Sequence, residues 1–184
     1  MSEIRLSEKP VFLATHGESI TRAEFKDDQW MVTESHLGTW VNYLVNDPQT
    51  PENVFAGTQT EGVQVSKDTG KTWQSIGLQD TPVKSLVVHP YDSRIIYAGG
   101  SPVSLYVTYN AGKNWEELPE MRKARRWWWF SPANPPSLEP YVQALTISPT
   151  NPKVIMAGIE LGGVLRSEDG GITWSGHRRC AVLD

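Results

Sequence analysis

Short apolar runs separated by turn-forming residues are the dominant pattern along this chain of 184 residues. Segments 54–58, 95–99 and 154–158 are rich in Val, Ile and Ala, and each lies between clusters of Gly, Pro, Asn and Asp. Runs of this length and composition are typical of β-strands joined by tight turns. No long segment has the 3.6-residue apolar period of a helix. The pattern therefore predicts an all-β fold.

One eight-residue phrase occurs three times, with the skeleton Ser/Thr-x-Asp/Asn-x-Gly-x-x-Trp. A hydroxyl followed by a short carboxylate or amide can accept hydrogen bonds from turn amides. Gly permits a positive φ, and Trp supplies a large apolar surface for a neighbouring sheet. We therefore expect each phrase, here called a box, to form a structural hairpin turn. The box residues are Ser66, Asp68, Gly70, Trp73, Thr108, Asn110, Gly112, Trp115, Ser167, Asp169, Gly171 and Trp174.

The spacing of the boxes defines a repeat. The box tryptophans are separated by 42 and 59 residues, and so are the prolines at 48, 90 and 149. A degraded unit precedes them: segment 11–15 lies 43 residues before 54–58, and Trp30 lies 43 residues before Trp73. Repeats of this length, each with several short strands, favour a β-propeller.

The boxes resemble the Asp-box, or BNR repeat, of sialidase-like and glycosyl-hydrolase-like β-propellers. Xyloglucan hydrolases, sortilin-type receptors and photosystem II assembly factors carry similar boxes. The resemblance implies four-stranded antiparallel blades in a single partial propeller, with the first blade lacking its opening strand. Arg5 is followed by Leu6 and Ser7, so the Arg-Ile-Pro phrase of catalytic sialidases is absent. The expected units are 11–40, 41–78, 83–118 and 141–176, with an inserted loop at 119–140.

Four units do not determine how, or whether, the ring of blades closes. Propellers generally close with four to eight blades. The chain could be part of a longer propeller, two arcs could complete a ring as a homodimer, or four units could close on themselves.

Charge and composition narrow the functional classes. The net charge is −4, from 17 basic and 21 acidic residues, which predicts neither nucleic-acid nor membrane binding. The start of the sequence has no apolar signal core and Cys180 is the single cysteine, so we expect a cytoplasmic location. The four histidines have no metal-ligand spacing, and we expect neither a metal nor a cofactor.

The resemblance implies that ligands enter from the face that carries the loops between second and third strands and the blade junctions. On that face we expect Glu160 and Glu61, which are weak catalytic candidates together with His177. Two carboxylates about 5–9.5 Å apart are the minimal apparatus of a glycosidase. The candidate ligand-binding residues are Arg125, Arg126, Trp127, Trp128, Glu160, His177, Arg178 and Arg179.

Adjacent guanidinium and indole groups suit anions and sugar rings, although the aromatic residues of the inserted loop could equally cover a blade edge. We therefore expect a propeller that acts as a binding or scaffold module for a glycan or an anionic small molecule. A glycoside hydrolase of sialidase-like or xyloglucanase-like type is an alternative. A protein-assembly factor that binds a partner protein on the same face is another.

Overall fold

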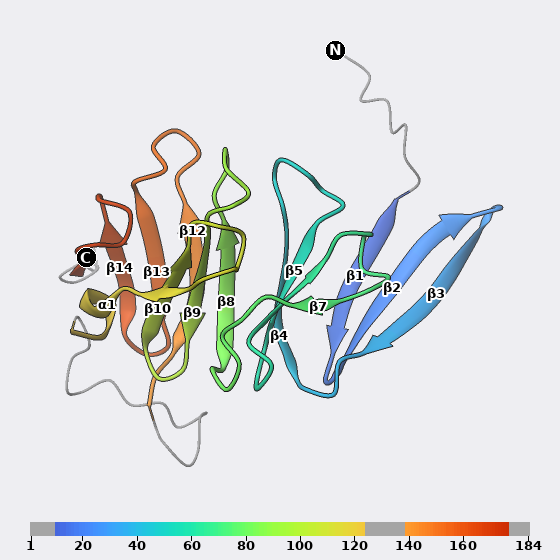
Figure 1. Ribbon diagram of the computed structural model, residues 1–184, viewed down its shortest axis with the longest axis horizontal. Coiled ribbons are helices and arrows are strands. Elements are labelled where there is room, and N and C mark those ends of the chain that lie inside the picture. The colour runs from blue at the N-terminus through green and yellow to red at the C-terminus, as the bar shows by residue number, and fades with distance from the viewer. Residues whose placement is uncertain (1–9, 124–138, 177–184) are drawn as a thin grey trace, which may run out of the picture.

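The structure is a computed structural model, and it describes residues 10–123 and 139–176. These residues form four antiparallel sheets that lie side by side in chain order (Figure 1). The first sheet contains β1 (Val11–His16), β2 (Ser19–Lys26) and β3 (Gln29–His36). The second contains β4 (Val41–Asn46), β5 (Val54–Thr58), β6 (Val63–Ser66) and β7 (Gln74–Ser75).

The other two sheets repeat the arrangement of the second. The third sheet contains β8 (Val83–Val88), β9 (Ile96–Gly100), β10 (Ser104–Thr108) and β11 (Glu116–Glu117). The fourth contains β12 (Val142–Ile147), β13 (Ile155–Ile159), β14 (Gly163–Ser167) and β15 (Ser175–Gly176). A short helix, α1 (Pro119–Lys123), lies at the start of the predicted inserted loop and buries Met121 completely.

The sheets form an open arc. The first and fourth sheets lie at opposite ends of the molecule in Figure 1. The all-β partial propeller predicted from the sequence is therefore confirmed, including a first sheet with one strand fewer than the others. The alternative in which four units close on themselves is wrong, because the two terminal sheets do not meet. No helix in the described part of the chain is long and apolar enough to cross a bilayer.

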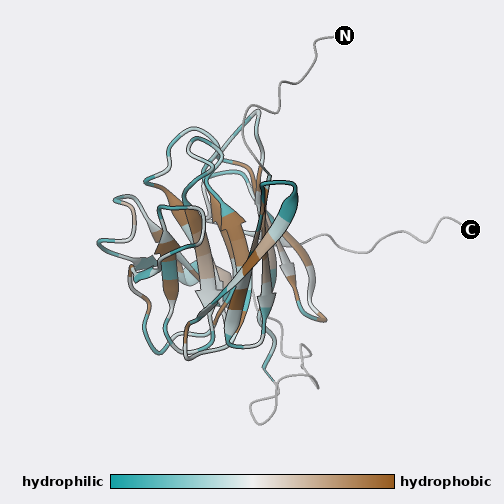
Figure 2. Ribbon diagram, turned by 90° about the vertical axis from the view of Figure 1, so that its right-hand side faces the viewer, coloured by the Kyte–Doolittle hydropathy of each residue, from teal (hydrophilic) through white to brown (hydrophobic). Residues whose placement is uncertain are grey.

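The core lies between successive sheets, where apolar strands face each other (Figure 2). Two glycines allow this close approach. A Cβ placed on Gly57 would lie 2.7 Å from Val83 Cγ1 of the third sheet, and one on Gly99 would lie 2.6 Å from Val142 Cγ1 of the fourth. Strand pairing places Gly57 and Gly99 at equivalent positions. The apolar runs 54–58, 95–99 and 154–158 of the sequence are therefore not in register, because strand pairing makes 54–58 equivalent to 96–100 and 155–159.

The first sheet also departs from the repeat inferred for it. Leu13 packs toward the second sheet, whereas Phe12 points away from it and is 61% exposed. Trp30 packs at a tilt against Phe12 and Phe25 on this outer face, with its ring centroid 5.4 and 5.2 Å from theirs. Asp27 and Asp28 join β2 to β3 with positive φ, so a two-residue turn replaces the box. Trp30 is thus not an equivalent of the box tryptophans. The 43-residue offset assumed for the first unit is therefore out of register, and an offset that is wrong by one residue assigns each side chain of a strand to the opposite face of the sheet.

Candidate ligand-binding site

The boxes form self-contained turns at one end of the sheets. In the second sheet, Ser66 Oγ accepts a hydrogen bond from Gly70 N at 2.7 Å, and Asp68 Oδ1 accepts one from Thr72 N at 2.9 Å. The Thr72 hydroxyl also donates to Asp68 Oδ2 at 2.6 Å, and the hydrogen bonds from the hydroxyl and the N–H of Thr72 hold the pKa of Asp68 well below its usual range. A carboxylate that already accepts hydrogen bonds from its own turn is poorly placed to act on a ligand.

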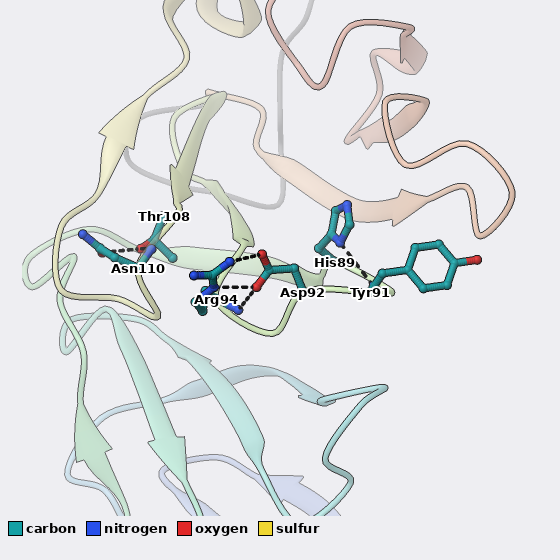
Figure 3. Close-up of polar contacts among 6 residues, drawn as sticks. All are labelled: His89, Tyr91, Asp92, Arg94, Thr108 and Asn110. Atoms are coloured by element: carbon teal, nitrogen blue, oxygen red, sulfur yellow. Dashed lines mark hydrogen bonds and ion pairs between the residues drawn. The ribbon is translucent and has the colours of Figure 1, made fainter.

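The box of the third sheet carries an amide in place of the carboxylate. Thr108 Oγ1 lies 3.0 Å from Asn110 Oδ1, beside the Asp92–Arg94 ion pair of the neighbouring turn (Figure 3). Trp115 packs on the preceding sheet and donates from Nε1 to the Ile76 carbonyl at 2.7 Å. Trp115 therefore connects the third sheet to the second, and this structural role of the box leaves the opposite end of the strands as the place for a ligand site.

At that opposite end, each four-stranded sheet repeats one backbone contact. The residue that follows the second strand donates its N–H to the carbonyl of the residue that precedes the first strand. The donors are Gln59, Ser101 and Glu160, and their acceptors are Trp40, Pro82 and Tyr141, with N–O distances of 2.8, 3.0 and 3.1 Å. The contact fixes where each loop side chain emerges. Polar side chains of successive sheets are thereby brought to one face.

Five of the residues on this face form what we call the polar cluster: Asn42, Gln59, Lys84, Tyr141 and Glu160. Lys84 Nζ donates to Gln59 Oε1 at 2.8 Å and lies 5.5 Å from the centre of the Tyr141 ring. Asn42 Nδ2 donates to the Val83 carbonyl at 3.0 Å, and its Oδ1 lies 3.5 Å from Lys84 Nζ. The cluster therefore joins the second, third and fourth sheets through side chains.

The electrostatics of the polar cluster are governed by partial burial. Burial lowers the pKa of Lys84, and the nearby charge of Glu160 opposes that shift. Burial also raises the pKa of Tyr141, and Glu160 raises it further. Glu160 Oε2 is buried and has no hydrogen-bond partner among the described residues. A buried carboxylate oxygen without a partner is costly, because desolvation is not offset.

The structure places the predicted site residues unevenly. Glu160 belongs to the polar cluster, on the face where the sequence predicted it. Glu61 follows Gln59 by two residues but is exposed, and no contact joins its side chain to the cluster among the described residues. No contact between the side chains of Glu61 and Glu160 is present in the described part of the chain. The remaining candidates lie outside the described residues: Arg125, Arg126, Trp127, Trp128, His177, Arg178 and Arg179.

Sequence reasoning did not assign Asn42, Lys84 or Tyr141 to the site. Asn42 and Lys84 are the second residues of β4 and β8, at equivalent positions 42 residues apart. The repeat spacing could have identified them, because it predicts that equivalent positions lie side by side around the arc. Tyr141 carries no comparable signal, since it precedes β12 after the inserted segment.

Similar proteins were found at the level of both sequence and structure. The Sortilin-Vps10 family, described as sortilin, neurotensin receptor 3, matches residues 15–157. A probable oligoxyloglucan-reducing end-specific xyloglucanase of Neosartorya fischeri is 30% identical over 83 residues, which are 41% of this chain and 10% of that protein. The corresponding xyloglucanase of Emericella nidulans is 28% identical over 83 residues, with the same coverage.

Two solved structures share the fold. The GH74 enzyme of Niastella koreensis superposes with a TM-score of 0.60 and 16% identity, over 89% of this chain and 29% of that chain. An ancestral GH74 enzyme gives a TM-score of 0.56 and 15% identity, over 91% of this chain and 25% of that chain. The chain thus spans about a tenth of the curated relatives and less than a third of the solved structures. Because the family match extends over most of the sequence, the chain belongs to the Sortilin-Vps10 family, and its four sheets are blades of a β-propeller.

Proposed function

We propose that the polar cluster binds a glycan. The observation that carries this proposal is the cluster itself: two amides, an ammonium group, a tyrosine ring and a buried carboxylate oxygen without a partner converge from three sheets. These groups come from the ends of strands and from the loop residues that the repeated backbone contact holds in place. Their positions are set by the scaffold.

The chemistry of the polar cluster suits a polyhydroxylated ligand. Each sugar hydroxyl both donates and accepts, and the side chains of Asn42 and Gln59 offer both kinds of group. The face of Tyr141 can pack against the apolar face of a sugar ring. Glu160 Oε2 can accept a hydrogen bond from a hydroxyl, which would relieve its lack of a partner. The printed names of two curated relatives point to xyloglucan as a first ligand to test.

Isothermal titration with a xyloglucan oligosaccharide tests the proposal. We expect saturable binding that weakens about tenfold in Lys84→Met, which keeps the aliphatic stem but removes the ammonium group. The same loss is expected for Asn42→Ala. Glu61→Gln is the matched control, because Glu61 lies in the same loop as Gln59 but outside the cluster. The absence of binding, or equal weakening by Glu61→Gln, would contradict the proposal.

A glycoside hydrolase is a second candidate, favoured by the unpartnered carboxylate of Glu160. The two acid groups of a glycosidase lie about 5–9.5 Å apart, so a second carboxylate must join Glu160 at the bound sugar. Release of reducing ends from xyloglucan oligosaccharides measures this activity. Glu160→Gln should abolish turnover while binding by titration persists. Binding by the unsubstituted protein without turnover would reject the hydrolase and leave the binding module.

A further inference from the structure

Lys84 differs from the other lysines in the described part of the chain. The side chain of Lys84 is half-buried, whereas the lysines at positions 26, 67, 71, 113, 123 and 153 are exposed. Lys84 Nζ donates to Gln59 Oε1 at 2.8 Å and lies 3.5 Å from Asn42 Oδ1. Both acceptors are neutral amides, and no carboxylate among residues 10–123 and 139–176 forms a direct ion pair with this ammonium group. Lys84 is therefore a candidate for chemistry that uses an amine as a nucleophile.

A β-bulge sets the position of Lys84. The pairing of β8 with β9 passes from Val83 to Ser85, so Lys84 is the extra residue of the bulge. The same interruption makes Asn42 the extra residue of β4 and Gln143 that of β12. Bulges redirect side chains and are common beside active sites. Two of these three equivalent positions carry an amide, and the third sheet places an amine there.

Glu160 provides the second group that amine chemistry requires. Its Oε2 is buried and accepts no hydrogen bond from the described residues. Burial lowers the pKa of Lys84, and the nearby charge of Glu160 opposes that shift. Burial thus favours the neutral amine, which is the form that attacks an electrophile. A carboxylate without a partner, close to such an amine, can accept its proton and return it in a later step.

We propose that Lys84 forms an imine with a small α-hydroxyaldehyde, and that Glu160 carries the proton of this reaction. An aldehyde needs no further reactant, because its condensation with an amine releases only water. The iminium nitrogen of Lys84 keeps a single N–H, so Asn42 and Gln59 lose a donor to their side-chain oxygens. A hydroxyl on the carbon next to the aldehyde can replace that donor. This reaction is independent of the proposed glycan binding.

The steps conserve atoms, protons and electrons. Glu160 takes one proton from the Lys84 ammonium group, which frees the lone pair on the nitrogen. The lone pair forms a C–N bond to the carbonyl carbon, the C=O π electrons move onto oxygen, and a proton passes from nitrogen to that oxygen. Glu160 then returns its proton to this hydroxyl, the C–O bond breaks, and water leaves. The product is an iminium cation beside a carboxylate, with the same charges as the starting pair.

Reductive trapping with glycolaldehyde tests the site. Sodium cyanoborohydride reduces the iminium to a stable hydroxyethyl-lysine, which peptide mass spectrometry locates. At low conversion we expect Lys84 to react about tenfold faster than Lys113, an exposed lysine in the box of the third sheet, because the neutral fraction of an amine rises steeply as its pKa falls. In guanidinium chloride, where the fold is lost, the two lysines should react equally. Equal rates in the folded protein would overturn the proposal.

Two variants separate proton transfer from the effect of charge. Glu160→Gln removes a charge that raises the pKa of Lys84, so it would speed the reaction if Glu160 acted through charge alone. Proton transfer by Glu160 predicts the opposite, and we expect Lys84 to react about tenfold more slowly in this variant. Glu61→Gln, with an exposed carboxylate outside the polar cluster, is the matched control and should leave the rate unchanged. A faster reaction in Glu160→Gln would overturn the role of Glu160.

A conservative variant guards against a purely structural effect. Glu160→Asp keeps a carboxylate on a shorter side chain and should react with glycolaldehyde faster than Glu160→Gln. Circular dichroism shows whether each variant retains its strands, and the rate at Lys113 serves as the internal reference in every sample. Equal rates in the two variants would contradict proton transfer. Titration with a xyloglucan oligosaccharide is a separate measurement, so failure of the imine proposal is distinguished from failure of the glycan proposal.

Discussion

The contact between the third and fourth sheets and the contact between the first and second sheets are built from the same repeat, but they differ in packing. Twelve described side chains form the buried cluster of the third and fourth sheets, including Leu105, Val142 and Ile155. Only Ile20, Val41 and Ala56 are buried in the cluster between the first and second sheets. Because strand pairing within each sheet is similar, the difference in stability between the two contacts should come from the apolar side chains buried between the faces of neighbouring sheets.

Two features account for the weaker contact. A buried guanidinium, that of Arg22, stands where the other contacts have apolar side chains, and it donates from Nε to the Thr69 carbonyl at 2.9 Å. A cavity of about 470 Å³ beside β1 leaves apolar groups without neighbours. Close packing contributes dispersion energy that a gap forfeits. We therefore expect the first sheet to be the least stable part of the arc.

The largest expected effect is a core truncation in the well-packed contact. Leu105 is fully buried, and Leu105→Ala should lower the free energy of unfolding by about 3 kcal/mol. Leu13→Ala, beside the cavity, should cost only about 1 kcal/mol because Leu13 is partly exposed already. Urea denaturation measures both values. Equal losses would show that the two contacts are equally well packed.

A substitution at equivalent glycines should have a somewhat smaller effect. Gly99→Ala introduces a Cβ against Val142 and should cost about 1–3 kcal/mol through overpacking. Gly158 occupies the equivalent position of the fourth sheet, where the nearest side-chain atom to such a Cβ is that of Ala144 at 3.5 Å. Gly158→Ala should therefore change stability by no more than about 0.5 kcal/mol. Thermal or urea unfolding of the two variants measures the difference. Equal losses of stability would contradict the view that Gly99 faces a neighbouring sheet while Gly158 faces open space.

Hydrogen exchange in the unsubstituted protein compares the two contacts directly. The amides of Phe12 and Ala14, which bond to β2, should exchange about tenfold faster than those of β9 and β13. The reason is that the first sheet can open without disrupting the large apolar cluster of the other sheets. Equal protection across all four sheets would mean that the arc unfolds as a single unit.

The smallest expected effect concerns the boxes. Hydrogen bonds from Thr173 and Ser167 lower the pKa of Asp169 from 3.8 to about 2. The charged form is favoured in the folded state, so its contribution is complete above pH 3.8 and is lost as the pH falls toward 2. Asp169→Asn, which imitates Asn110 of the third sheet, should flatten the pH dependence of stability in this window. Unfolding curves at several pH values measure it, and an unchanged slope would reject the assignment.

Much of the fold could be predicted from the sequence, because the repeats carry their own markers. Trp73, Trp115 and Trp174 set the period, and apolar runs between turn residues set the strands. The register could not be predicted to the residue. The run 54–58 is equivalent to 96–100 and 155–159, one residue away from the runs read from the sequence, and Trp30, which lies 43 residues before Trp73, is on the outer face of the first sheet. Alternation has a period of two, so an error of one residue reverses every face.

The site was predicted less completely than the fold. Glu160 was identified from its loop, whereas Lys84 and Asn42 were not, because each lies within an ordinary apolar strand. Nothing local distinguishes such residues from solvated polar positions. Their importance comes from Gln59 and Tyr141, which are remote in sequence and adjacent in space.

The sequence by itself determined the strands, the turns and the number of units, since these depend on local alternation, glycine conformations and side-chain to backbone hydrogen bonds. Only the tertiary structure decided which faces meet, which edge stays unpaired and which polar groups converge. Those features depend on the distances between sheets and on the exclusion of water from the space between them, and neither is a property of any single segment.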